Sequence, residues 1–187
     1  MAGAALRWAP PGKFHVAGHS MGGYVALEML RQAPERIEAL ALIATNARAD
    51  STESMENRKR LMATAGTDFP AVIRTQMPRL LSREHLEDRA MVSTIARMAT
   101  AVGKEAFMRQ QRAIIGRIDS RPHLAAIRCP TLVVAARHDA IMPVPLLEEI
   151  AAGIAGAKLA VVEESGHVIP IEQPGELNRL LLDWMKR

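Results

Sequence analysis

The sequence predicts an α/β protein with a mainly parallel sheet of about four strands, flanked by helices and interrupted by an inserted helical cap. Short, almost continuous apolar runs alternate with segments of helical periodicity, a pattern typical of parallel strands covered on both faces. A serine between glycines stands where the first such run passes into a helical segment. A long middle segment shows helical patterns alone, and we therefore expect it to be an insertion.

Four runs are predicted to be strands because each is short, apolar and bounded by polar or turn-forming residues. These strands comprise residues 14–17, 37–44, 131–136 and 159–162. Helices are expected at residues 24–30, 145–151 and 174–184. In the last helix four apolar residues recur at i, i+3, i+4 and i+7, namely Leu177, Leu180, Leu181 and Trp184. This spacing forms one face that can pack against a core.

The predicted domain organisation is an α/β core formed by residues 1–49 and 125–187, with residues 50–124 inserted as a helical cap or lid. The inserted segment contains no convincing strand. Asp50 stands three residues before Glu53, a spacing typical of the start of a helix. We therefore expect three or four helices between two strands of the sheet.

Composition indicates an ordinary globular protein and excludes several other classes. Apolar residues make up 49% of the chain, but no apolar stretch approaches the roughly 18 residues of a membrane-spanning helix. One cysteine, Cys129, leaves no internal disulfide, and the first residues lack the pattern of a signal peptide. We therefore expect a cytoplasmic protein that does not span a membrane.

Positive charge is concentrated in the middle of the chain. Residues 51–128 carry fourteen Lys and Arg against eight Asp and Glu, a net charge of +6. The arginines are dispersed and aromatic residues make up only 3% of the chain, so nucleic acid is not an expected partner. A solvated helical surface is the default interpretation, and attraction of an anionic substrate or carrier is the alternative.

Residues 18–23, G-H-S-M-G-G, are the most informative segment because they follow a predicted strand and open a predicted helix. A G-x-S-x-G pattern at such a junction is typical of a nucleophile elbow, a strained turn that only small neighbours allow. Gly18 and Gly22 are expected to supply that room, and Gly23 to let the helix pack close to the sheet. The turn would raise the Ser20 hydroxyl above the sheet, at the positive end of a helix.

A serine hydroxyl is a weak nucleophile unless a histidine removes its proton and a carboxylate orients that histidine. The chain offers both partners, because Asp139 follows the third predicted strand and His167 follows the fourth. Parallel strands share a direction, so both loops should emerge at the same sheet edge as Ser20.

The motifs match those of a known family in order and spacing. They are Gly18-x-Ser20-x-Gly22, the run 130–134 leading to Asp139-x-x-x-Pro143, and Gly166-His167 followed by Glu172-x-Pro174. On these residues the chain resembles an α/β-hydrolase of the capped esterase, lactonase and C–C hydrolase type, over most of residues 13–187. The resemblance implies that Ser20 is the nucleophile, Asp139 the orienting acid and His167 the general base. It also implies that the backbone N–H of Met21 forms half of the oxyanion hole.

Several other residues could act as the acid or line the pocket. Asp139 could instead be a turn former, and three other carboxylates are then the alternative acids: Glu163, Glu164 and Asp50. His19 and His138 are expected to line the substrate pocket, and a solvated position is expected for His85. No histidine or carboxylate cluster has the spacing of metal ligands, so neither a metal nor an organic cofactor is expected.

The resemblance also implies parts of a fold that this sequence does not contain. The family's sheet has eight strands, with the nucleophile after the fifth, yet only seventeen residues precede Gly18. We therefore expect a fragment or a mis-called start. A short form that dimerises through its exposed first strand and an inactive remnant are the alternatives. The family's second oxyanion donor would also be missing, at a cost on the order of 10²–10³ in rate.

The expected function is hydrolysis of a small-molecule ester, thioester or lactone through an acyl-enzyme on Ser20. C–C bond hydrolysis of an anionic diketone is the closest alternative, because it uses the same three residues and the basic middle segment would suit it. A cofactor-free haloperoxidase is a more distant one. A non-catalytic binding module built on a hydrolase remnant is the alternative from a different functional class.

Overall fold

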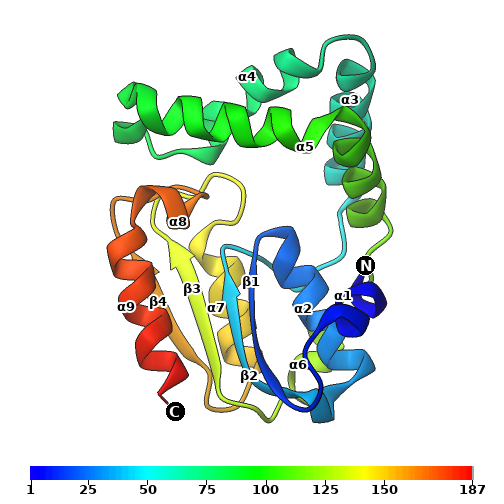
Figure 1. Cartoon of the computed structure of the whole chain (residues 1–187), viewed down its shortest axis with the longest axis vertical. Helices are drawn as coiled ribbons and strands as arrows, with labels where there is room; N and C mark the ends of the chain where they lie inside the picture. The colour runs from blue at the N-terminus through cyan, green and yellow to red at the C-terminus, as the bar shows by residue number, and fades with distance from the viewer. Residues whose placement is uncertain (187) are drawn as a thin grey trace.

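A computed structural model describes residues 1–186, in which four parallel strands form one sheet in the order β1-β2-β3-β4 (Figure 1). The strands are β1 (Phe14–His19), β2 (Ile37–Ile43), β3 (Thr131–Ala136) and β4 (Lys158–Val162). Each pairs in parallel with its neighbour, so the carboxyl ends of all four lie at one edge. The predicted fold class is therefore confirmed.

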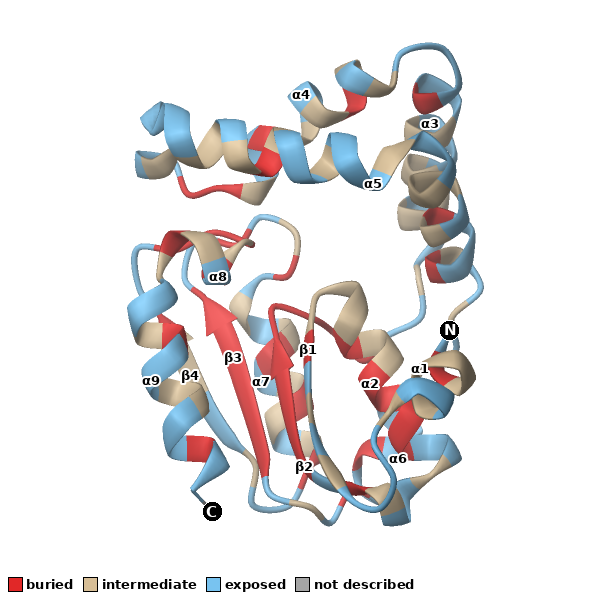
Figure 2. Cartoon of the chain, viewed as in Figure 1, coloured by how far each residue is buried: buried red, intermediate tan, exposed pale blue. Residues whose placement is uncertain are grey.

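Helices cover the two faces of the sheet because alternate residues of each strand point to opposite sides. On one face, α2 (Met21–Gln32) and α7 (Val144–Gly153) pack on Leu40 and Leu42 of β2. On the other face, α9 (Pro174–Met185) packs on the sheet through Leu177 and Trp184, which share a buried cluster with residues of β2 and β3. β2 and β3 are buried along nearly their whole length (Figure 2), which accounts for their apolar sequences.

Three short helices and two 3₁₀ turns complete the connections. They are α1 (Ala2–Trp8), α6 (Arg121–Leu124), α8 (Ile169–Glu172), η1 (Pro34–Arg36) and η2 (Glu84–Glu87). Within the described residues β1 pairs with β2 alone, and its residues His15 and Ala17 are exposed. β1 is thus an edge strand, and its pairing with a second copy stays a prediction.

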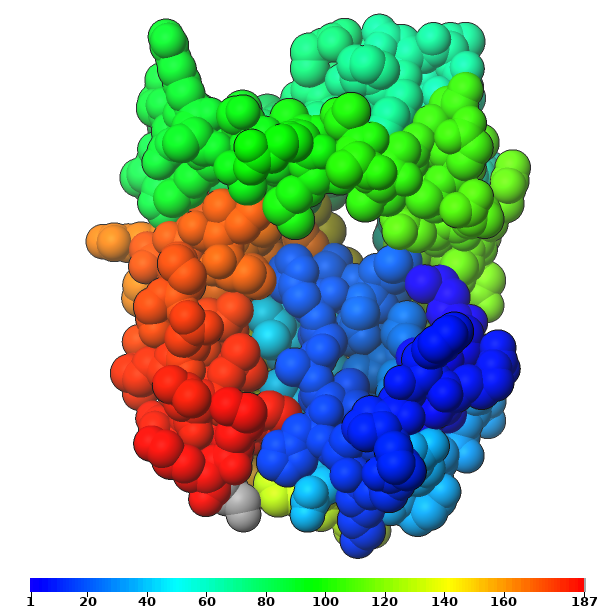
Figure 3. Space-filling view, in the orientation of Figure 1, coloured from blue at the N-terminus to red at the C-terminus, as the bar shows by residue number. Residues whose placement is uncertain are grey.

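The inserted helices lie over the carboxyl ends of the strands (Figures 1 and 3). They are α3 (Thr52–Thr67), α4 (Phe69–Leu80) and α5 (Arg89–Ile115), and α5 bends at Gly103, where φ is 80°. The predicted insertion runs to residue 124, but Leu124 of α6 is buried in the core cluster of α2 and α7. No helix within residues 1–186 combines the length and the apolar character needed to cross a membrane.

We expect Leu42→Ala to lower the free energy of unfolding by about 2–5 kcal/mol, because Leu42 is fully buried between the sheet and its helices. Urea denaturation measures this change. Leu182→Ala on α9 is the control, since Leu182 is 53% exposed and its truncation should change stability little. Equal losses in the two variants would contradict the assignment of the core.

Candidate active site

Ser20 occupies a strained turn between β1 and α2. Its φ of 53° and ψ of −117° lie in a region that side-chain-bearing residues rarely adopt. The turn is held by the Ser20 N–H, which donates to the Ile43 carbonyl at 2.9 Å, and by the Thr45 hydroxyl, which donates to the Ser20 carbonyl at 2.8 Å. The nucleophile candidate is therefore fixed by the neighbouring strand and the residues after it.

Of the three glycines around this turn, two have no room for a side chain. A Cβ on Gly18 would collide with the backbone of Gly22, and a Cβ on Gly23 would collide with Thr45. A Cβ on Gly22 would meet nothing within 4 Å. The close approaches thus require glycine at 18 and 23, whereas the expectation that Gly22 itself needs the space is not met.

The structure brings together the three side chains expected to carry the chemistry. His167 Nε2 lies 2.8 Å from Ser20 Oγ, and His167 Nδ1 lies 2.8 Å from Asp139 Oδ2. A carboxylate only accepts, so Nδ1–H donates to Asp139 and Nε2 is left to accept the hydroxyl proton of Ser20. Both His167 and Asp139 are buried, which shields these hydrogen bonds from water.

The backbone after β3 fixes the Asp139 carboxylate. Its Oδ1 atom accepts hydrogen bonds from the N–H groups of Ile141 at 2.7 Å and Met142 at 2.8 Å, leaving Oδ2 directed at His167. The three alternative acids lie elsewhere. Glu163 pairs with Arg137, Glu164 is exposed, and Asp50 pairs with two arginines: Arg58 and Arg117. Asp139 is the carboxylate that contacts the histidine.

Met21 is the first residue of α2 and directly follows Ser20. The N–H groups in the first turn of a helix have no partner within the helix, and they carry the positive end of its dipole. The N–H of Met21 thus belongs to this helix end, in the residue next to Ser20, where a negative oxygen could be stabilised.

The two histidines expected in the pocket lie outside the cavity lining. His19 Nε2 lies 2.8 Å from the His167 carbonyl oxygen, so His19 supports the loop that carries His167. Burial lowers the pKa of His19 below its ordinary value of 6.5, and the nearby His167 adds to this effect. His138 is exposed, and its backbone N–H, which donates to the Ser165 carbonyl, takes part in holding this loop.

Glu172, which the sequence marks only as part of the Glu172-x-Pro174 motif, supports the site. Its fully buried carboxylate accepts hydrogen bonds from Gly166 N–H at 2.9 Å and Ser82 N–H at 2.7 Å, and contacts His85 Nδ1 at 3.0 Å. The expectation that His85 is solvated is therefore wrong. Glu172 joins the loop of His167 to the segment between α4 and α5.

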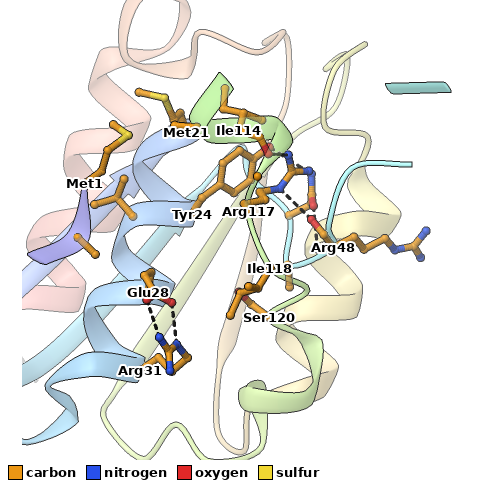
Figure 4. Close-up of a pocket in the computed structure, with 16 residues that line it drawn as sticks. Met1, Met21, Tyr24, Glu28, Arg31, Arg48, Ile114, Arg117, Ile118 and Ser120 are labelled. Atoms are coloured by element: carbon orange, nitrogen blue, oxygen red, sulfur yellow. Dashed lines mark hydrogen bonds and ion pairs between the residues drawn. The ribbon is translucent and has the colours of Figure 1, made fainter. Parts of the chain in front are cut away.

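A cavity of about 550 Å³ opens over Ser20 and His167, between the sheet layer and the inserted helices. The helices α3, α4 and α5 each contribute residues to its lining, among them Arg58, Leu61, Ile73, Gln76, Phe107 and Gln111. A neighbouring cavity of about 290 Å³ shares several lining residues with it, among them Met21, Tyr24 and Arg117 (Figure 4). Figure 3 shows the surface hollowed between α5 and the segment that contains β1 and α2.

No three or more His, Cys, Asp or Glu side chains gather within residues 1–186 in a way that could hold a metal ion.

We expect Glu172→Gln to destabilise the protein by about 1–3 kcal/mol, because the amide leaves a buried donor without its acceptor. Urea denaturation measures the loss, and Glu164→Gln at an exposed neighbouring position is the control. If both variants were as stable as the unmodified protein, the buried carboxylate would not hold these segments together.

Comparison with known proteins assigns this arrangement to a family. The chain is 32% identical, over 90% of its length, to a protein of Azorhizobium caulinodans that carries the provisional name carbamate hydrolase RutD. A thermophilic esterase from Thermogutta terrifontis is 32% identical and superposes over 99% of this chain with a TM-score of 0.90. The enol-lactonase of Burkholderia xenovorans LB400 is 26% identical and superposes over 94% with a TM-score of 0.85.

The chain spans 64% of the length of the RutD relative, 69% of the esterase and 66% of the enol-lactonase. The family model described as the alpha/beta hydrolase family matches residues 2–180. Because this match covers nearly the whole sequence, including the turn at Ser20 and both later loops, the chain belongs to the alpha/beta hydrolase family.

Proposed function

We propose that the protein is a serine hydrolase that acts on a small-molecule ester, thioester or lactone through an acyl-enzyme. The observation that carries this proposal is the 2.8 Å contact between His167 Nε2 and Ser20 Oγ, in a histidine that Asp139 orients from its other nitrogen. Hydrogen-bond contact between a hydroxyl and an oriented base is what nucleophilic catalysis by serine requires.

In the acylation step His167 Nε2 takes the proton of the Ser20 hydroxyl while Oγ attacks the substrate carbonyl carbon. The carbonyl oxygen becomes negative, and the N–H of Met21 donates to it. Asp139 stabilises the imidazolium that forms on His167. When the tetrahedral intermediate collapses, the bond to the leaving group breaks, and His167 returns the proton to that group.

In the deacylation step the same residues act on water. His167 removes a proton from a water molecule, whose oxygen attacks the acyl carbon bound to Ser20 Oγ. Collapse of the second intermediate releases the acid, and the proton on His167 returns to Ser20. The chain's own residues therefore supply the nucleophile, the base and one oxyanion donor.

The names of the relatives support acyl transfer as the reaction class. A carbamate, an ester and an enol-lactone, the substrates named for the three relatives, each carry a carbonyl carbon bonded to a heteroatom that can leave. The inserted helices would close the cavity over such a substrate and act as its cap.

C–C bond hydrolysis of an anionic diketone is the second candidate, because it could use the same three side chains. The observation that favours it is the presence of arginines in the cavity wall, among them Arg58 and Arg117.

Reaction with a fluorophosphonate probe tests the proposal, because the probe labels a serine that an adjacent base activates. We expect stoichiometric labelling of Ser20, located by mass spectrometry, and none in Ser20→Ala. In His167→Ala the labelling rate should fall about 10²–10⁴-fold, the usual contribution of a general base.

His123→Ala is the matched control, since His123 is exposed on α6 and the labelling rate should not change. A folded sample that the probe does not label would contradict acyl-enzyme chemistry and favour the non-catalytic binding module.

A further inference from the structure

We propose that Arg58 and Arg117 form a carboxylate subsite in the cavity over Ser20, so that the substrate carries a carboxylate in addition to the carbonyl that Ser20 attacks. This inference rests on the proposed function for the reaction itself and adds the substrate class. It follows from the charges in the cavity wall and from the way in which they are held.

Arg58 and Arg117 share a single counterion. Arg58 Nε donates to Asp50 Oδ2 at 2.7 Å, and Arg117 Nη1 donates to Asp50 Oδ1 at 2.6 Å. The side chains of Arg58, Arg117 and Asp50 are 19%, 11% and 2% exposed. Two guanidinium groups therefore face one carboxylate, with little access to water.

This group carries one unbalanced positive charge. Removing a charge from water is unfavourable unless a partner of opposite charge replaces the lost hydration. All three side chains line the cavity that contains Ser20 and His167, and Asp50 is the one carboxylate among its described lining residues. An anion bound in the cavity would balance the charge, and the cavity is where it could enter.

Other contacts keep the two arginines in place. The guanidinium of Arg117 lies 4.3 Å from the ring centre of Tyr24 (Figure 4), which is a cation–π geometry. Tyr24 belongs to α2, the helix that begins beside Ser20. Arg58 Nη1 donates to Gln111 Oε1 at 3.0 Å. The positive groups are thus fixed relative to the nucleophile before a substrate arrives.

Two further arginines belong to the cavity lining, Arg48 and Arg79. Arg48 pairs with Glu149 on α7, and Arg79 donates to the Ala140 carbonyl.

Arg58 already directs Nε and Nη2 at Asp50, and Arg117 Nε donates to the Arg48 carbonyl. The remaining guanidinium N–H groups would each donate a single hydrogen bond to a bound carboxylate, so the matching ligand is a small carboxylic acid derivative. Half-esters of dicarboxylic acids and carboxylated lactones have this chemistry.

A pair of matched substrates tests the subsite. The mono-4-nitrophenyl ester of adipic acid and 4-nitrophenyl hexanoate differ only in a terminal carboxylate or methyl group. We expect the ratio of their kcat/KM values, adipate over hexanoate, to fall about tenfold to hundredfold in Arg58→Gln, the range for hydrogen bonds to charged groups. Arg117→Gln should lower it as well.

Asp50→Asn should change the same ratio in the opposite direction, because it removes the negative charge that competes with the substrate. A merely structural disturbance would not lower the ratio in the arginine variants and raise it in Asp50→Asn. Arg60→Gln is the control, since Arg60 lies on the same helix as Arg58 but is exposed and outside the cavity lining, and its ratio should equal that of the unmodified protein.

Calorimetric binding of adipate to Ser20→Ala separates this inference from the proposed reaction. One result is that adipate binds, and binds more weakly when Arg58→Gln is added, while neither ester is hydrolysed. That result would support the subsite and contradict the proposed reaction. If both esters are hydrolysed at a ratio that the Arg58, Arg117 and Asp50 variants leave unchanged, the subsite is overturned. Absence of both hydrolysis and adipate binding would overturn both.

Discussion

The hydrogen bond between His167 and Ser20 is the interaction on which the rest of the arrangement depends. It joins side chains 147 positions apart in the sequence, and it exists because parallel strands bring their carboxyl ends to one edge of the sheet. β1 ends at the strained Ser20, β3 leads to Asp139, and β4 leads to His167. A register change in any of these strands would move one of the three groups by several ångströms, so the pairing of the strands positions the three side chains.

The inserted helices are coupled to the loop of His167 through Glu172. A Cβ on Gly166 would collide with the backbone of Leu81 and Ser82, and the Val168 N–H donates to the Leu80 carbonyl at 3.2 Å. The loop of His167 is therefore pressed against the end of α4, with the Glu172 carboxylate between them. These contacts link the roof of the cavity to the imidazole of His167, so that a shift of one would move the other.

Sequence patterns can locate the residues that a nearby strand or turn in the sequence positions. Ser20, Asp139 and His167 each follow a recognisable apolar run, and serine chemistry requires all three types together. Glu172 and Ser82 are 90 residues apart, so no local pattern could reveal their contact. The subsite arginines were visible only as an excess of positive charge over residues 51–128, because a helix pattern does not say which charges face a cavity. The sequence also predicts His138 in the pocket, whereas its side chain is exposed, because the direction of that side chain depends on the turn after β3.

A crystal structure of the phosphonylated protein tests the central claim most directly. We predict a covalent bond between phosphorus and Ser20 Oγ, with a phosphoryl oxygen about 2.7–3.1 Å from the Met21 N–H and His167 Nε2 facing the leaving-group side. A phosphonate attached to a different residue, or a Ser20 adduct with the imidazole of His167 turned away from it, would contradict the account.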